Sequence, residues 1–238
     1  MEKMRVGGLV VNVVRKNIKN LHLAVYPPNG WVRVATPMRV SDEAVRLAVA
    51  SRLGWILRQQ KKLLGQDRQS PREYVSRESH YFLGRRYLLN VVYQDGPAGV
   101  SVNGKPAIDL FVPKGASRVK RQRVLDQWYR KELKLIIPPL ISKWEQIMDL
   151  KVAAWWVKKM KTRWGTCNPT ARRIWINLEL AKKPVQCLEH IVVHEMVHLL
   201  ERRHDERFIG YMDKFLPQWR SHKDLLNRFP LRHEKWEY

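Results

Sequence analysis

Two histidines four residues apart, His194 and His198, are the side chains of this sequence best placed to do chemistry. Positions four apart lie on one face of a helix, so both imidazoles can reach one metal ion. Glu195 adjoins the first histidine, where a carboxylate can take a proton from a water molecule that the ion activates. His204 provides a third ligand if the chain leaves the helix and doubles back around residues 201–203. Three protein ligands leave the fourth tetrahedral position of a zinc ion open, as in catalytic sites.

The same pattern also occurs by chance on amphipathic helices, with half-exposed histidines and no metal. Here the surrounding residues are apolar, namely Ile191, Val192, Met196, Val197, Leu199 and Leu200. A buried helix keeps histidines and a glutamate at a high desolvation cost unless something pairs with them, and a divalent ion does so. We therefore predict one zinc ion at His194, His198 and His204. His190 also precedes His194 by four residues, but that frame lacks a glutamate in the base position, so we interpret His190 as structural.

Charge is the second informative feature. The chain has 45 Lys and Arg against 22 Asp and Glu, a net charge of +23. Such a field attracts polyanions, and nucleic acid is the commonest of them. The basic residues that we consider as contacts with DNA or RNA are Lys120, Arg121, Arg123, Lys158, Lys159 and Lys161. The last three lie among Trp155, Trp156 and Trp164, which favours single strands if those rings are exposed; the alternative is a solvated surface over buried tryptophans.

Length and composition predict a folded globular protein of two lobes. The chain has 238 residues, 45% of them hydrophobic, with ten tryptophans. The first residues show no signal peptide and no stretch long enough to span a membrane, so we expect a cytoplasmic protein without a membrane partner. Cys167 and Cys187 are too few for a disulfide framework and suit a reducing compartment.

The N-terminal part, residues 1–115, is expected to be a β-rich subdomain with one long helix. Patterns typical of strands and hairpins cover 9–14, 21–26, 31–35, 81–92 and 99–112. The second and third of these should pair as a hairpin. Ser41 is a good cap for a helix that continues to Leu64 and stops at Gly65. The polar stretch 66–79 is the best candidate for a linker.

Residues 116–238 are expected to form the second domain and to contain the metal site. A helix begins at Ser117, and Pro138-Pro139 should end or kink it before a further helical stretch to about Met148. Three strands at 152–157, 162–167 and 173–178 should form a small antiparallel sheet, one edge of which can bind an extended polypeptide. The metal-binding helix follows Pro184, and a helix with Phe208, Tyr211, Met212 and Phe215 packs beneath it. The fold class predicted for the chain is therefore α+β.

Several segments resemble the YgjP-like zinc metallopeptidases, which are relatives of the SprT-like proteases in the zincin group. These segments are Arg163-Trp164-Gly165-Thr166-Cys167, Ile174-Trp175-Ile176-Asn177, the run from Ile191 to Leu199, and His204-Asp205-Glu206-Arg207-Phe208. The resemblance implies a zincin-like domain, zinc at His194, His198 and His204, and Glu195 as the general base. Members usually have asparagine before the third histidine and serine after the glycine, where this chain has Arg203 and Thr166. SprT-like proteases are associated with proteins bound to DNA, which suits the charge by analogy.

The function predicted is hydrolysis of peptide bonds by a zinc-activated water with a glutamate base. Two alternatives remain open. A zinc-dependent nuclease suits the charge, although phosphodiester cleavage often uses two metal ions. A non-catalytic, zinc-stabilised nucleic-acid-binding protein would use the ion only as a staple. Tyr211, Arg220 and His222 are candidates to stabilise an oxyanion, but a structural role suits each of them better.

Overall fold

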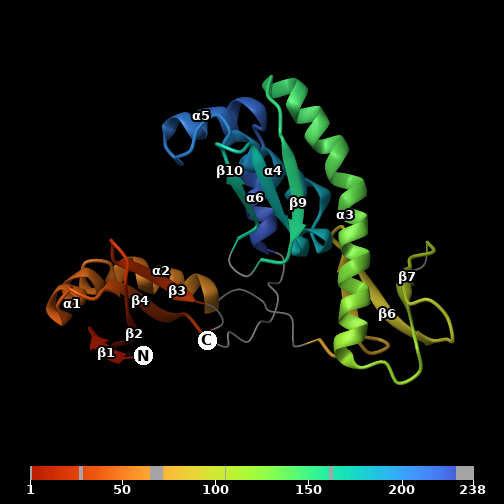
Figure 1. The fold of residues 1–238 in the computed structure, drawn as a ribbon, viewed down its shortest axis with the longest axis horizontal. Coiled ribbons are helices and arrows are strands. Elements are labelled where there is room, and N and C mark those ends of the chain that lie inside the picture. The colour runs from red at the N-terminus through yellow and green to blue at the C-terminus, as the bar shows by residue number, and fades with distance from the viewer. Residues whose placement is uncertain (1, 27–28, 65–71, 105, 161–162, 229–238) are drawn as a thin grey trace. The chain divides into compact units, whose positions relative to one another are not determined.

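The structure of the chain is a computed structural model, and it describes residues 2–26, 29–64, 72–104, 106–160 and 163–228. It is a mixture of helices and small sheets, which confirms the predicted α+β class (Figure 1). Contacts divide the described residues into two compact units, which fall within Met1–Pro71 and Arg72–Phe229. Even the longest helix in the described ranges lacks the apolar stretch needed to cross a bilayer.

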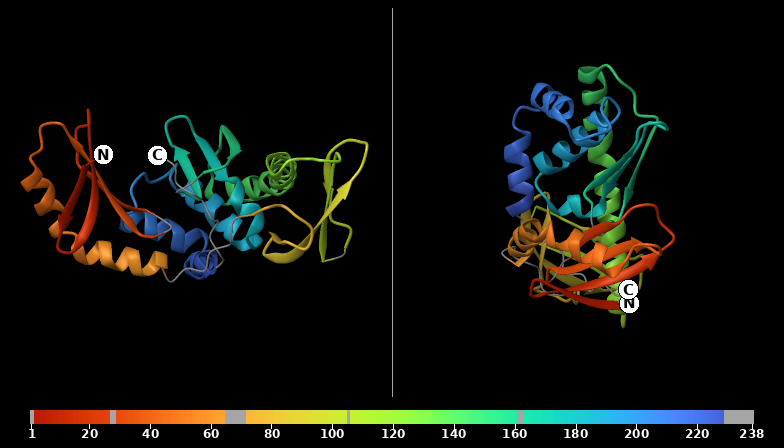
Figure 2. Two further views of the ribbon diagram at one scale, coloured as in Figure 1. Left: turned by 90° about the horizontal axis from the view of Figure 1, so that it is seen from below. Right: turned by 90° about the vertical axis from the view of Figure 1, so that its left-hand side faces the viewer.

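The first unit is a four-stranded sheet covered by two helices. Its strands β1 (Glu2–Val6), β2 (Leu9–Lys16), β3 (His22–Tyr26) and β4 (Trp31–Pro37) lie in the order β1-β2-β4-β3. The hairpin predicted from 21–26 and 31–35 is confirmed as β3 and β4, which pair antiparallel. Helices α1 (Asp42–Ala50) and α2 (Leu53–Leu64) lie along one face of the sheet (Figure 2). Alternate valines of β2 and β4 point to that face and are buried with Val45, Val49 and Ile56 of the helices.

The single helix predicted from Ser41 to Leu64 is wrong, because it is interrupted at residues 51 and 52. Ser41 caps α1 as expected, with its hydroxyl accepting from the amide of Ala44 at 3.3 Å. The Ser51 hydroxyl donates to the carbonyl of Ala48, and the Arg52 amide bonds the carbonyl of Val49 three residues back. A serine that bonds the preceding turn competes with the helical pattern, which explains the break.

The second unit begins with a sheet that repeats the arrangement of the first. Strands β5 (Ser79–Phe82), β6 (Arg85–Tyr93), β7 (Gly99–Ser101) and β8 (Ala107–Val112) lie in the order β5-β6-β8-β7. In both sheets the two central strands pair parallel and each outer pair is antiparallel. The sequence repeats too, since Val-Val-Asn-Val-Val at 10–14 in β2 corresponds to Leu-Leu-Asn-Val-Val at 88–92 in β6. The linker proposed at 66–79 is described only from residue 72, where the chain is irregular up to β5.

Helix α3 (Arg118–Met148) follows this sheet and is continuous over 31 residues. The expected end or kink at Pro138-Pro139 is therefore wrong. Each proline removes one helical donor, to the carbonyls of Lys134 and Leu135. All four of these residues are exposed, so water can satisfy the freed carbonyls. The buried face of the helix, which contains Ile137, passes through uninterrupted.

The β5–β6 hairpin packs directly on residues 181–184, which lead into the helix predicted to bind the metal. Leu83 and Gly84 form its turn with positive φ, and their amides donate to the carbonyls of Ala181 and Lys182 at 2.9 and 3.3 Å. A Cβ on Gly84 would come within 2.7 Å of Pro184, so only glycine permits this approach. The compact units accordingly divide near residue 71, whereas the sequence suggested a boundary after residue 115. The second sheet belongs to the same unit as that helix, because its turn is hydrogen-bonded to the segment just before it.

The third sheet contains β9 (Ala154–Lys158), β10 (Gly165–Asn168) and β11 (Arg173–Asn177), in the order β10-β11-β9. It is mixed, so the prediction of a small antiparallel sheet is wrong. β10 and β11 pair antiparallel, but β9 pairs with β11, which runs in the same direction. The buried side chain of Asn177 holds the connection, donating to the carbonyls of Met160 and Arg163 at 2.9 and 2.6 Å.

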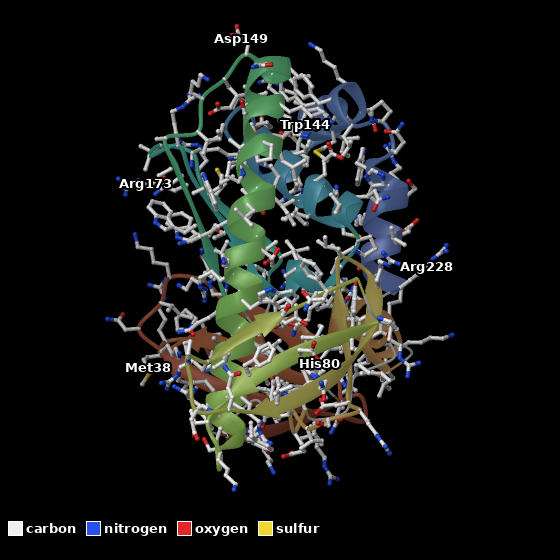
Figure 3. The ribbon with its side chains drawn as sticks, turned by 90° about the vertical axis from the view of Figure 1, so that its right-hand side faces the viewer. Met38, His80, Trp144, Asp149, Arg173 and Arg228 are labelled. Carbon is white, nitrogen blue, oxygen red and sulfur yellow. The ribbon has the colours of Figure 1, made fainter. Side chains whose placement is uncertain are left out.

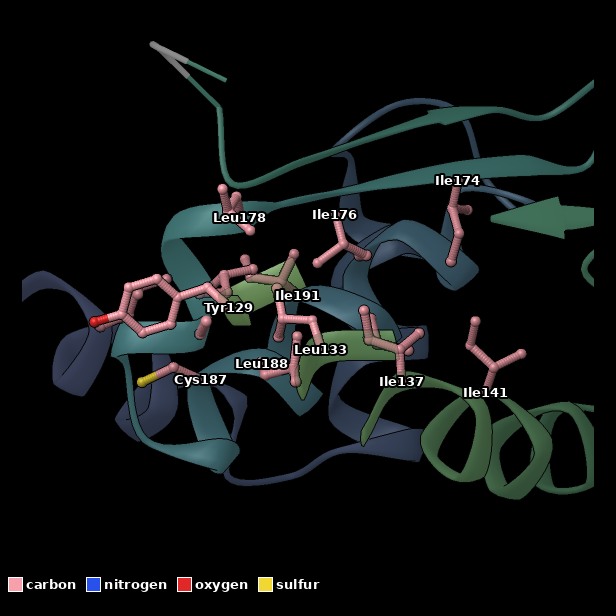
Figure 4. Packing of buried hydrophobic residues seen from close by; sticks show 14 of the residues in the cluster. Tyr129, Leu133, Ile137, Ile141, Ile174, Ile176, Leu178, Cys187, Leu188 and Ile191 are labelled. Carbon is pink, nitrogen blue, oxygen red and sulfur yellow. The ribbon is translucent and has the colours of Figure 1, made fainter. Parts of the chain in front are cut away.

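The remaining elements are the 3₁₀ helix η1 (Leu178–Lys182), α4 (Val185–Val197), α5 (Glu206–Phe215) and α6 (Trp219–Arg228). Helix α4 lies between the third sheet and α3, and its apolar residues join one large core (Figure 4). Leu133, Ile137 and Ile141 of α3 face Ile174 and Ile176 of β11 across Leu188 and Ile191 of α4. Helix α4 is thus fixed on two sides.

Candidate metal centre

Helix α4 presents His194 from its last turn and ends at Val197, so that His198 is its C-cap. Beyond it the bonding tightens, and the amides of Leu199 and Leu200 reach carbonyls three residues back at 2.9 Å. The chain therefore leaves the helix slightly before the expected break at 201–203 and returns to α5. Arg203 is not among the described residues with positive φ. The turn needs no left-handed residue there, so arginine in place of the usual asparagine causes no backbone strain.

The three histidines of the prediction converge on one point. One nitrogen from each of His194, His198 and His204 lies within 4.8 Å of the other two. The Nε2 atoms of His194 and His204 are 3.0 Å apart. Nitrogens bound to one zinc ion at about 2.0–2.1 Å in tetrahedral geometry lie about 3.4 Å apart, so these residues need little movement to hold an ion.

Phe208 and the loop carbonyls orient the imidazoles. The Phe208 ring is buried, and its centroid lies 4.9, 4.8 and 4.6 Å from those of His194, His198 and His204. His198 Nδ1 lies 3.1 Å from the carbonyl of Glu201, which leaves Nε2 free to bind a metal. Asp205 caps α5 through the amide of Phe208 and so fixes the loop that carries His204.

Burial lowers the pKa of His194 and of His198, which favours the neutral form that binds metal. It lowers the pKa of His194 to about 3, and the adjacent His198 and His204 act in the same direction. Burial also lowers the pKa of His198, against the hydrogen bond to Glu201. Neutral imidazoles at neutral pH are ready to donate lone pairs to a cation without first losing a proton.

Glu195 lies between the metal helix and the edge strand β10. It is 5% exposed, and burial raises its pKa to about 8, against the positive charge of Arg163. A Cβ on Gly165 would lie only 2.4 Å from Glu195 Oε1, so the carboxylate packs directly on the strand backbone. Gly165 was not assigned a role from the sequence, although a glycine inside a strand is a signal of such close approach.

The other residues considered at the site have partners elsewhere. His190 is buried, stacks on Trp219 with centroids 6.2 Å apart and meets the His194 ring edge-on at 6.1 Å, but it is not one of the three grouped histidines. Arg220 pairs with Asp213, and Tyr211 stacks on Phe215. His222 accepts a weak hydrogen bond from Cys187 at its carbonyl. These contacts place His190, Tyr211 and Arg220 in the packing of α4–α6, whereas the contact of His222 is through its backbone. Cys167 faces the same side of β10 as Gly165, and burial followed by the charge of Glu195 raises its pKa to about 12.

The basic residues proposed for nucleic acid lie on two elements. Lys120, Arg121 and Arg123 belong to the first turns of α3, where the first and last are exposed. Lys158 is exposed at the end of β9, whereas Lys159 bonds Asp126 of α3 at 2.6 Å. Lys161 lies outside the described residues. Trp155 and Trp164 pack against the core, which leaves Trp156 as the exposed ring of that segment.

Helix α4 and the loop after it offer three clustered histidines that could hold a metal ion. Such a site in an α+β unit is of the kind found in metal-dependent hydrolases. The family model described as YgjP-like, metallopeptidase domain matches residues 19–229. The chain therefore belongs to the YgjP-like metallopeptidase family, and the resemblance found in its motifs is confirmed. A comparison with curated proteins finds no match.

Proposed function

We propose that this chain is a zinc-dependent peptidase in which His194, His198 and His204 hold one zinc ion and Glu195 is the general base. The observation that carries the proposal is the convergence of three imidazole nitrogens beside a buried carboxylate. All three protein ligands are neutral nitrogens, a set that suits zinc with one position left open. The family match supports peptide hydrolysis in particular.

The residues of the chain divide the work between binding and proton transfer. When bound, zinc supplies Lewis acidity that acidifies a water molecule and polarises the scissile carbonyl. Glu195 takes the proton of that water as its oxygen joins the carbonyl carbon. The same carboxyl then gives the proton to the amide nitrogen as the C–N bond breaks. The cation also favours the ionised form of Glu195, opposing the effect of burial on its pKa.

An extended polypeptide is the substrate that the surroundings of Glu195 suit best. β10 is at the edge of its sheet, and β11 is its described partner. An edge strand offers main-chain donors and acceptors to a further strand, independently of side chains. Because Gly165 brings the backbone of β10 against Glu195, a polypeptide added there would run past the base.

We further propose that the substrates include proteins associated with nucleic acid. The net charge of +23 is the observation that favours this. The charge would equally suit a zinc-dependent nuclease or a non-catalytic binding protein, so the decisive experiment includes both.

The test compares wild type with Glu195→Gln and His204→Ala on an unfolded polypeptide such as reduced casein. We expect one zinc ion per wild-type chain by elemental analysis. Glu195→Gln should retain zinc and lose activity by about 10²- to 10⁴-fold in kcat, the usual contribution of a general base. His204→Ala should lose both the zinc ion and the activity. The matched control is Glu206→Gln, an exposed glutamate at the start of α5, which should change neither.

Single-stranded DNA incubated with the same variants separates the alternatives. Cleavage of DNA that depends on Glu195, with casein left intact, would contradict the peptidase and support the nuclease. Zinc binding without hydrolysis of either polymer would support the non-catalytic alternative.

A further inference from the structure

The solvent face of the third sheet contains a stacked pair of tryptophans. In β11 the buried Ile174 and Ile176 point toward α4, so Trp175 between them points to the opposite face. The parallel register places Trp156 of β9 beside Trp175. Their ring centroids are 5.3 Å apart with 22° between the planes, and Trp156 is 43% exposed. We call these two rings, with Arg173 and Lys158, the tryptophan platform.

Positive charge surrounds the platform. The guanidinium of Arg173 lies 5.9 Å from the centroid of the Trp156 ring, and Figure 3 shows Arg173 at the margin of the unit. Lys158 follows Trp156 by two residues in β9, so it lies on the same face, and it is exposed. No acidic side chain of the described ranges forms an ion pair with Arg173 or Lys158. The segment 150–178 contains seven Lys and Arg and no Asp or Glu.

This combination suits one kind of ligand. An exposed indole can stack on any base, and neighbouring arginine and lysine can bind the phosphates between bases. A duplex keeps its bases stacked inside, so rings on an open sheet face match a single strand. A polypeptide would bind the main-chain groups at the edge of β10. Its binding would not require a neighbouring segment that contains no carboxylate. Charge complementarity therefore favours a polyanion with planar groups.

We propose that the tryptophan platform binds single-stranded nucleic acid, with bases stacked on Trp156 and Trp175 and phosphates at Arg173 and Lys158. The platform is on the face of the sheet opposite to Gly165 and Glu195, so a bound strand leaves the peptidase site open. Its link to proteolysis rests on the function proposed above, whereas the binding itself does not. A strand held there would bring its associated proteins close to the edge strand.

The test is fluorescence anisotropy of labelled oligothymidine of about 12 nucleotides, within the site size of single-strand binders. The full chain is compared with Trp156→Ala and with the matched control Trp55→Ala, whose ring is 39% exposed in α2. We expect Trp156→Ala to weaken binding by about ten-fold or more and Trp55→Ala to leave it unchanged. Arg173→Ala should weaken binding and reduce the slope of log affinity against log salt by about one. Equal affinity of Trp156→Ala and Trp55→Ala would overturn the proposal.

Heparin and casein test whether the platform binds another kind of ligand, a polyanion without bases or a polypeptide. Heparin carries charge without bases, so Trp156→Ala should leave its binding unchanged; an equal loss for heparin and oligothymidine would overturn stacking. A raised KM for casein in Trp156→Ala, with oligothymidine binding unchanged, would assign the face to polypeptide and also overturn the proposal. If Trp156→Ala does not fold, Trp156→Phe should bind as wild type and Trp156→Leu should not, because only the first keeps an aromatic face.

The Glu195→Gln variant separates this proposal from the peptidase. It should bind oligothymidine as the wild type does, because Glu195 is in α4 and lies against the face of the sheet opposite to the platform. Oligothymidine binding that depends on Trp156, in a protein without any peptidase activity, would support the platform and contradict the catalytic proposal.

Discussion

The two four-stranded sheets have the same strand order and the same pairing, and the second is hydrogen-bonded through its β5–β6 turn to the segment that leads into α4. Each is followed by a serine-capped helix, at Ser41 and Ser117, with capping bonds of 3.3 Å. After the first sheet the helix breaks at Ser51 and covers its own sheet. After the second it continues for 31 residues, through two prolines, and its far half packs on α4 and β11. A repeated framework thus serves two purposes, depending on the helix that follows it.

The cores of the two units also differ in how many polar side chains they bury. Among the described residues of the first unit, Thr36 is the one polar or charged residue that is buried. The second unit buries more of them, namely His80, Asn177, Glu179, Lys183, His190 and Glu195. Burying such groups costs free energy that an apolar core avoids. The comparison teaches that the described part of the second unit accepts this cost at several positions, Glu195 of the candidate site among them, whereas the core of the first unit is almost entirely apolar.

Removal of the metal should have the largest effect on this contrast. An ion that binds the folded state at a free concentration about 1,000 times its Kd stabilises it by about 4 kcal/mol. Chelation should therefore increase hydrogen exchange in peptides from α4 and leave those from β2 and β4 unchanged, as measured by mass spectrometry. His204→Ala should show no further change on chelation. Equal loss of protection in both units would contradict the division.

A matched pair of buried isoleucines sharpens the comparison. Ile56 in α2 and Ile137 in α3 are both fully buried. Either change to alanine should cost about 2–5 kcal/mol of unfolding free energy, measured in urea. Only Ile137→Ala should also weaken zinc binding, measured by competition with a chelating dye, because α3 supports α4. Weaker zinc binding in Ile56→Ala would show that the first unit also supports the site.

Gly165→Ala tests the contact between the edge strand and the base. The added Cβ would displace the Glu195 carboxyl, and a displacement of about 1 Å costs roughly 10²-fold in rate. We expect kcat to fall by about that factor with zinc content and KM unchanged. Gly99→Ala is the control, because Gly99 lies in β7 with no atom within 4 Å of an added Cβ. Similar losses in the two variants would indicate a general effect on the strands instead.

The effect that builds up most gradually is the pH dependence of the metal-free protein. Burial raises the pKa of Glu195 from 4.5 to about 8. The stability from its protonated form is complete below pH 4.5 and is lost as the pH rises toward 8. The unfolding free energy of Glu195→Gln should therefore rise relative to that of wild type across this range, by roughly 1 kcal/mol per pH unit, and its Tm should rise in parallel. Parallel Tm curves would contradict the burial of an ionisable group there.

Acid should act in the opposite direction through His194. Burial lowers its pKa from 6.5 to about 3, so the stability from its neutral form is present above pH 6.5 and is lost toward pH 3. His194→Ala should reduce this acid-induced loss in the metal-free protein. The same thermal scans measure this loss of stability. If the Tm of His194→Ala fell with acid as much as that of wild type, the role given to His194 would be contradicted.

The segment that contains Lys158 and Trp156 shows why the sequence alone predicted only part of the tryptophan platform. The interleaving of Lys158 and Lys159 with tryptophans was visible in the sequence. Which ring is exposed depends on the alternation of β9, and the partner of Trp156 comes from β11 through a parallel pairing. Lys159 is bonded to Asp126, far away in the chain. Neighbours that meet through strand register cannot be read from local spacing.

By itself the sequence determined the histidine cluster and the hairpin of β3 and β4, because helical periodicity and turn chemistry act between residues close in the chain. Tertiary structure decided the rest. The prolines of α3 are tolerated because their freed carbonyls face solvent, and β9 pairs with β11 because it runs in the same direction. Glu195 meets Gly165 only when β10 packs on α4. These outcomes depend on contacts between distant segments, whose free energies no local pattern contains.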